Sequence, residues 1–74
     1  MHEITYKAIE FDTAFEALQY TEAAGGEAVL LDGRNYVMTQ GEADRIAAAG
    51  VEFAHLVQHE MADGDWRIMT IPVN

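Results

Sequence analysis

The sequence predicts one α+β domain over residues 1–74, with the element order β-α-β-β-α-β-β. Two observations carry this prediction. Two stretches combine a threonine cap with helical spacing of apolar residues, and two Asp-Gly pairs separate runs typical of strands. We therefore expect an antiparallel-rich sheet of about five strands with two helices on one face.

The first predicted strand covers residues 2–11. Ile4, Tyr6 and Ala8 alternate with polar residues and share one face. The alternation then slips, because Ile9 and Phe11 fall on the other face. Either a bulge lies near residues 8–9, or this strand has apolar neighbours on both sides.

The first predicted helix covers residues 13–24. Thr13 followed by Glu16 forms a possible capping box at its start. Gly25 and Gly26 end it, since glycine accepts the left-handed conformation needed at a helix exit.

Residues 27–38 are typical of a β-hairpin. Asp32-Gly33 fits a two-residue type I′ turn, whose positive backbone angles favour this pair. In that register Val29 faces Tyr36.

The second predicted helix runs from residue 40 to residue 49. Thr39 and Glu42 form a second possible capping box, in which the hydroxyl accepts from the Glu42 N–H and the carboxylate reaches back to the Thr39 N–H. Gly50 and Val51 fit a Schellman ending, with Val51 packing back on the helix.

Residues 51–61 fit either a helix or a strand by apolar spacing. We predict a strand, because Gly50 has just ended one helix and Asp63-Gly64 offers a turn into a clear last strand at residues 66–73. A two-residue turn would place Met61 opposite Trp66. The first six elements then match a ferredoxin-like arrangement, with the last strand added as a hairpin.

The charge of the chain argues against direct nucleic-acid binding. Asp and Glu number 13 and Lys and Arg number 4, for a net charge of −9, whereas phosphate binding depends on clustered cations. The acidity provides solubility, or it complements a basic partner or mimics a phosphate backbone.

Catalysis is not expected from this sequence. The chain has neither cysteine nor serine, and no phosphate-binding or dinucleotide-binding motif is present. Its small size also leaves little room for a concave site. We predict a protein without enzymatic activity and without a cofactor.

Targeting signals are also not expected. No apolar run approaches the roughly 18 residues of a spanning helix, and the first residues alternate polar and apolar types rather than forming a signal peptide. We predict a cytoplasmic protein that does not enter membranes.

Three histidines suggest a metal or ligand site as an alternative. His55 and His59 would share one side of a helix. On a strand they lie about 13 Å apart, since each residue rises about 3.3 Å, and cannot bind one ion. His2 joins them only if the first strand lies alongside.

Several strands carry apolar residues on both faces, which two helices on one face cannot cover. We therefore predict an apolar sheet face that binds a protein, with a homodimer as the leading hypothesis. The predicted contact residues are Phe53, Val57, Met61, Trp66 and Ile68. Alternatives are an acidic inhibitor of a nucleic-acid-binding protein, a ligand-binding domain using the histidines, and a closed monomer.

Overall fold

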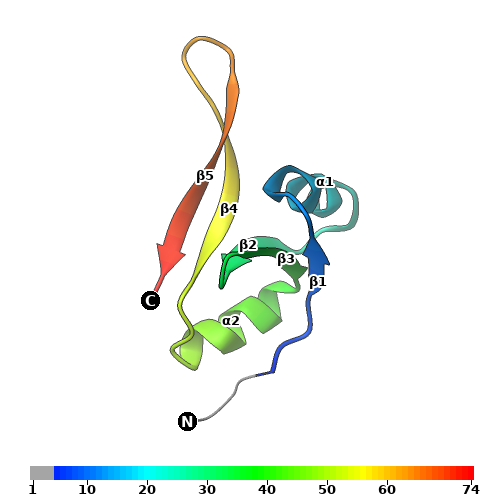
Figure 1. Cartoon of the computed structure of the whole chain (residues 1–74), viewed down its shortest axis with the longest axis vertical. Coiled ribbons are helices and arrows are strands. Elements are labelled where there is room, and N and C mark those ends of the chain that lie inside the picture. Colours follow the sequence, from blue (N-terminus) through cyan, green and yellow to red (C-terminus); the bar gives the residue numbers. More distant parts are fainter. Residues whose placement is uncertain (1–4) are drawn as a thin grey trace.

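A computed structural model describes residues 5–74 and confirms the α+β class and the predicted order of elements (Figure 1). The elements are β1 (Ile9–Phe11), α1 (Ala14–Ala24), β2 (Glu27–Leu31), β3 (Arg34–Met38), α2 (Gln40–Ala48), β4 (Phe53–Glu60) and β5 (Trp66–Val73). Residues 51–61, whose apolar spacing fits either a helix or a strand, contain a strand as predicted.

The five strands form one antiparallel sheet in the order β1-β3-β2-β4-β5. A ferredoxin-like sheet would place the fourth strand beside the first. Here β4 pairs with β2 instead, through Val29 opposite His55 and Leu30 opposite Ala54. The ferredoxin-like prediction is therefore right about element order and wrong about strand order.

The two helices cover opposite faces of the sheet, which corrects the prediction that they share one face (Figure 1). Val29 of β2 packs in a cluster with Ile46 of α2. Its neighbour Ala28 packs with Ala17 and Leu18 of α1. Since successive strand residues point to opposite faces, each helix must cover a different side of β2.

Strand order explains the placement of the helices. α1 joins β1 to β2 across β3, and α2 joins β3 to β4 across β2, so both connections move the same way across the sheet. β1 and β3 run in opposite directions. Right-handed connections, which are nearly universal between parallel strands, then put the helices on opposite faces.

Two apolar clusters form the core, one under each helix. The cluster under α2 contains Val29, Leu31, Met38, Ala43, Ile46 and Phe53. The cluster under α1 contains Ala17, Leu18, Ala28, Val37 and Leu56. Both faces of the central strands are therefore buried, which is why residues 28–31 of β2 are all apolar.

The helix ends follow the predicted capping through the threonine hydroxyl and the glycine, but the Glu16 carboxylate accepts from the Thr13 hydroxyl rather than from the Thr13 N–H. The Glu16 N–H donates to Thr13 Oγ1 at 3.1 Å, and the Thr13 hydroxyl donates to Glu16 Oε1 at 3.1 Å. At the end of α2, the Val51 N–H donates to the Ile46 carbonyl at 3.0 Å, and Gly50 has a φ of 86°. This is the predicted Schellman ending.

The β2–β3 hairpin has the predicted turn and register. Asp32 and Gly33 have φ values of 52° and 76°, as a type I′ turn requires. Val29 lies opposite Tyr36. These positions are confirmed because a two-residue turn fixes the pairing of both strands.

The β4–β5 hairpin has a longer turn than predicted. The Gly64 N–H donates to the Met61 carbonyl at 2.9 Å, and the Met61 N–H donates to the Asp65 carbonyl at 2.7 Å. Gly64 has a φ of 90°, so residues 62–64 form a three-residue loop ending in a glycine bulge. Trp66 therefore lies opposite Glu60 rather than Met61.

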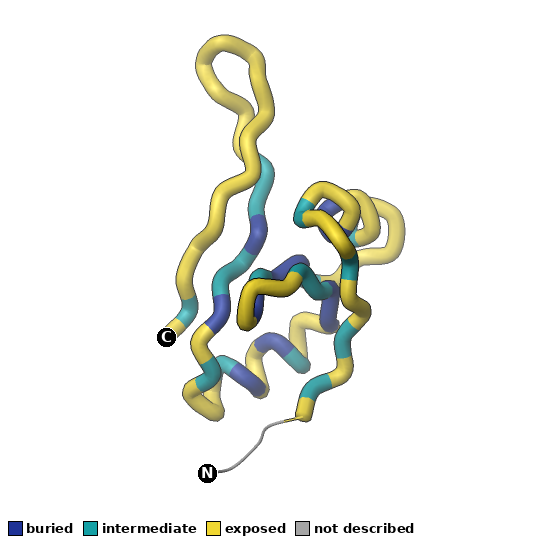
Figure 2. The backbone as a smooth tube through the Cα atoms, viewed as in Figure 1, coloured by how far each residue is buried: buried dark blue, intermediate teal, exposed yellow. Residues whose placement is uncertain are grey.

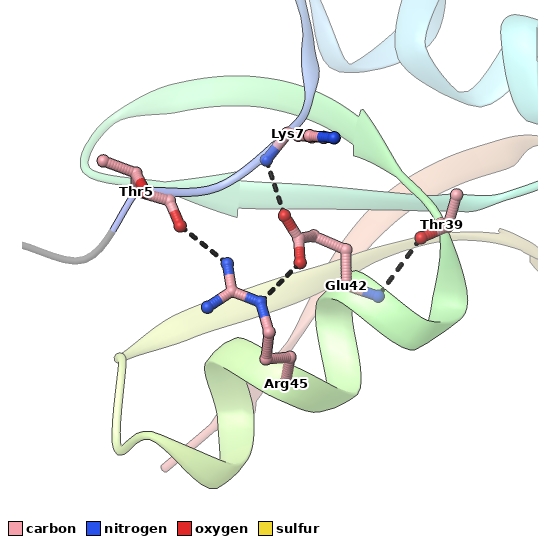
Figure 3. Close-up of polar contacts among 5 residues, drawn as sticks. All are labelled: Thr5, Lys7, Thr39, Glu42 and Arg45. Carbon is pink, nitrogen blue, oxygen red and sulfur yellow. Dashed lines mark hydrogen bonds and ion pairs between the residues drawn. The ribbon is translucent and has the colours of Figure 1, made fainter.

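The first strand is shorter than the predicted residues 2–11. Residues 2–4 lie outside the described part of the chain, and β1 begins only at Ile9. The segment before it runs along α2 instead (Figure 3). Its Lys7 N–H donates to Glu42 Oε2 at 2.6 Å, and its Thr5 carbonyl accepts from Arg45 at 2.6 Å.

Glu42 connects this segment to α2. Its N–H donates to Thr39 Oγ1 at 3.1 Å, as the capping box predicts, but its carboxylate binds Arg45 and the Lys7 N–H rather than Thr39. The Arg45 guanidinium, 2.6 Å away, and the Lys7 N–H lower the pKa of Glu42 to about 2. The residue that was predicted as a cap therefore also binds the segment before β1, at Lys7.

Candidate interaction surface

The β4–β5 hairpin extends away from the rest of the protein (Figure 1). The molecule measures 46 × 23 × 20 Å, and the hairpin lies along its longest dimension. Figure 2 shows the tip and nearly all of β5 as exposed. Seven of the eight residues of β5 are exposed, and only Val73 is half-buried.

Large apolar side chains gather on this hairpin. Of the eight large apolar residues that are exposed within residues 5–74, five lie on the hairpin. We call these five the hairpin surface: Met61, Trp66, Ile68, Met69 and Ile71. Trp66 is the most exposed, at 62%. Exposed apolar groups concentrated in this way normally mark a binding site.

The hairpin surface has two sides. Thr70 lies opposite Leu56, which packs under α1, and Ile68 lies opposite Gln58. Alternate residues of a strand share a face, so Trp66 and Ile68 lie on the same face of the sheet as α1. Met69 pairs with Val57, and Ile71 pairs with His55. Met69 and Ile71 therefore lie on the α2 face, the side to which Phe53 contributes.

The predicted contact set is divided by this register. The sequence placed Phe53, Val57, Met61, Trp66 and Ile68 on one face, but the extra loop residue moves Trp66 and Ile68 to the other face. Phe53 is only 6% exposed and belongs to the core, so its prediction as a surface contact is wrong. Val57 is half-buried, and Met61 lies at the edge of the turn.

Met69 and Ile71 were absent from the predicted set. The sequence does point to them, because residues 66–73 have apolar side chains on both faces of a strand. A last strand with apolar groups on both sides requires either two covering layers or a partner. At the end of β5, Val73 packs against the cluster under α2, and the other seven residues of the strand stay exposed.

Charges on the hairpin are confined largely to its tip. Glu60, Asp63 and Asp65 lie there, and the Asp65 N–H donates to Asp63 Oδ1 at 3.0 Å. Within β5 the one charged residue is Arg67. The hairpin therefore has an acidic tip, and Arg67 is the one charge along β5.

The histidines do not converge. His2 lies outside the described residues. His55 and His59 both lie on β4, and His55 Nδ1 is 3.6 Å from Glu27 Oε2. Within residues 5–74, no three metal-binding side chains lie close enough together to bind an ion.

The surface hollows within residues 5–74 are open to solvent. One of 430 Å³ lies between β1 and the end of α1, lined mainly by apolar residues such as Ile9, Tyr20 and Met38. Another of 550 Å³ lies over the Glu42–Arg45 pair, whose charges already neutralise each other.

Neither helix within residues 5–74 is long and apolar enough to cross a membrane.

Known protein families, curated proteins and solved structures provide no match to this chain. The hairpin surface is therefore the feature from which a function can be argued.

Proposed function

We propose that this protein is a small acidic, non-catalytic interaction module that forms a homodimer through the hairpin surface. The observation that carries the proposal is the exposure of apolar side chains on both sides of β5. Within residues 5–74, the two short helices leave most of this strand exposed, and a second copy can cover it.

The expected affinity is modest. A stable interface buries about 800 Å² on each partner, and one exposed strand with its side chains provides less than this. The net charge of −9 on each copy adds repulsion. We therefore expect a reversible dimer that dissociates on dilution and gains stability with added salt.

The carboxylates give less support to an acidic inhibitor of a nucleic-acid-binding protein. Such an inhibitor needs negative charges in a row on one surface. Here Glu22 lies on α1, Asp32 in the β2–β3 turn, Asp44 on α2 and Asp63 at the hairpin tip. This distribution favours solubility over mimicry of a phosphate backbone.

Light scattering over a concentration series tests the proposal. Wild-type protein should approach twice its monomer mass of 8.2 kDa as concentration rises. Trp66→Gln should shift the equilibrium to monomer, because it removes the most exposed apolar side chain of the surface. Phe15→Gln is the matched control, since Phe15 is 52% exposed on α1 and is not part of the hairpin surface, and the dimer should persist.

Two results would reject the proposal. One is a wild-type mass that stays monomeric at every concentration. The other is a dimer that Phe15→Gln disrupts and Trp66→Gln does not, since that result would move the contact to α1.

A further inference from the structure

β5 forms the outer edge of the sheet, and the backbone groups on its open side can be assigned. The Met61 N–H donates to the Asp65 carbonyl, which makes these two residues the closing hydrogen-bonded pair of the hairpin. Hydrogen-bonded and non-hydrogen-bonded pairs alternate along an antiparallel ladder. Odd-numbered residues of β5 therefore bond to β4, and even-numbered residues direct their N–H and C=O groups outward.

Pro72 supports this assignment independently. Proline has no N–H to donate and is tolerated at a sheet edge when its nitrogen faces away from the neighbouring strand. Pro72 is an even-numbered residue of the edge strand and pairs with Ala54. Trp66, Ile68 and Thr70 therefore offer complete outward pairs of donor and acceptor, while Pro72 offers only an acceptor.

We propose that two copies of the chain join β5 to β5 as antiparallel neighbours, about a twofold axis at Ile68, to form one continuous ten-stranded sheet. This inference rests on the proposed dimer and specifies its geometry. The edge can complement itself, because an antiparallel copy matches each outward donor with an acceptor.

Pro72 excludes the registers centred after Ile68. With Ile68 opposite Ile68 of the second copy, Trp66 lies opposite Thr70, and every outward N–H and C=O from residues 66 to 70 has a partner. Moving the axis to Met69 or Thr70 would bring Pro72 into the ladder, where its missing N–H leaves a carbonyl of the other copy without a donor.

The side chains fit this register on both faces. On the α1 face, Ile68 meets Ile68 directly, and Trp66 reaches Ile68 of the second copy diagonally. On the α2 face, the Met69 side chain lies beside Arg67 of the second copy, whose apolar stem can cover it while the guanidinium stays in water. Exposed side chains on both faces of β5 therefore contact the second copy.

Charge favours the antiparallel direction. The acidic tips, with Asp63 and Asp65, lie at opposite ends of the joined strands. The two Gly64 residues are separated by eight positions, or about 26 Å at about 3.3 Å per residue. That exceeds the screening length of about 8 Å at physiological salt, whereas a parallel pair would place the tips side by side.

The opposite edge of the sheet is less suited to pairing. β1 has three residues, Ile9–Phe11, against eight in β5. The Arg34–Glu10 ion pair at 3.4 Å also places charges along it. β5 has no helix on its open side, so a second copy can approach it freely (Figure 1).

Single cysteines test the geometry, because the natural chain contains none. We would prepare Ile68→Cys, Met69→Cys and Thr70→Cys, with Ile9→Cys as a control at the other edge, where Ile9 is 47% exposed. Each is oxidised under dissolved oxygen at a concentration where wild type is dimeric, and the covalent dimer is measured on a non-reducing gel. A twofold axis at Ile68 sets the two Cα atoms about 5.5 Å apart, within disulfide range.

We expect Ile68→Cys to cross-link at least several-fold faster than the other three variants. Faster cross-linking at Met69 or Thr70 would overturn the register. A wild-type dimer with no preferred cross-linking on β5 would overturn edge pairing and leave the proposed homodimer intact. A monomeric wild type would remove both.

Discussion

Phe53 and Trp66 allow a direct test of how the structure divides the predicted contact set. Phe53→Ala removes a ring that is 6% exposed and packs among Val29, Met38 and Ile46. Truncation of a buried phenylalanine costs about 3–5 kcal/mol, because it loses both transfer free energy and packing around the cavity. For a domain whose total stability is roughly 4–11 kcal/mol, this loss is a large fraction.

Trp66→Ala removes a larger side chain that is already 62% exposed. Nearly two-fifths of its surface is covered, on the order of 80 Å², so at about 25 cal/mol per Å² its loss costs at most about 2 kcal/mol. No closed cavity remains, since the site opens to water.

Urea denaturation followed by far-ultraviolet circular dichroism measures both variants. The protein should be dilute enough to be monomeric, and repetition at a tenfold lower concentration checks this. The reasoning is refuted if Phe53→Ala costs less than about 1 kcal/mol, or if Trp66→Ala costs as much as Phe53→Ala.

Three further outcomes are expected. Glu42 has a folded-state pKa of about 2 against an ordinary 4.5, so its contribution to stability is full above pH 4.5 and is lost as the pH falls toward 2; Glu42→Gln should flatten that part of an acid titration, and an unchanged titration would contradict the Arg45 contact. Gly26→Ala should destabilise by more than about 2 kcal/mol, because its φ is 96° and the new Cβ would lie 2.9 Å from the Met38 carbonyl. Gly50→Ala, with φ of 86° and nothing within 4 Å, should cost about 1 kcal/mol, and equal thermal shifts for the two would count against this packing. Thr13→Ala should cost about 1 kcal/mol in chemical denaturation, because the Glu16 N–H loses its cap; no loss would show that the cap is not formed.

Local signals in the sequence predicted much of the fold. The Thr13 and Thr39 caps, the Gly50 exit and the Asp32-Gly33 turn all lie where residue chemistry placed them. Each depends on contacts within about six residues, so the neighbouring sequence is sufficient to specify it.

Strand order could not be predicted in the same way. Whether β4 joins β1 or β2 depends on long-range packing, and both choices are compatible with the same order of elements. That choice decides whether the helices share a face. The apolar run at Ala28–Leu31, which is buried on both sides, was the sequence signal for helices on opposite faces.

The interaction surface was only partly predictable for a related reason. An Asp-Gly pair supports both a two-residue turn and a three-residue turn, and the structure has the longer one at residues 62–64. A slip of one residue moves Trp66 and Ile68 to the other face of the hairpin. The last strand was predicted correctly, but the face of the hairpin on which Trp66 and Ile68 lie was not.

Amide hydrogen exchange along β5, measured at low and high protein concentration, tests the central claim most directly. If a second copy pairs with this edge, the Trp66, Ile68 and Thr70 amides should become protected as concentration rises, while the amides already bonded to β4 change little. Outward amides that exchange at the same rate at both concentrations, in a protein that is dimeric by mass, would place the contact elsewhere and contradict the account.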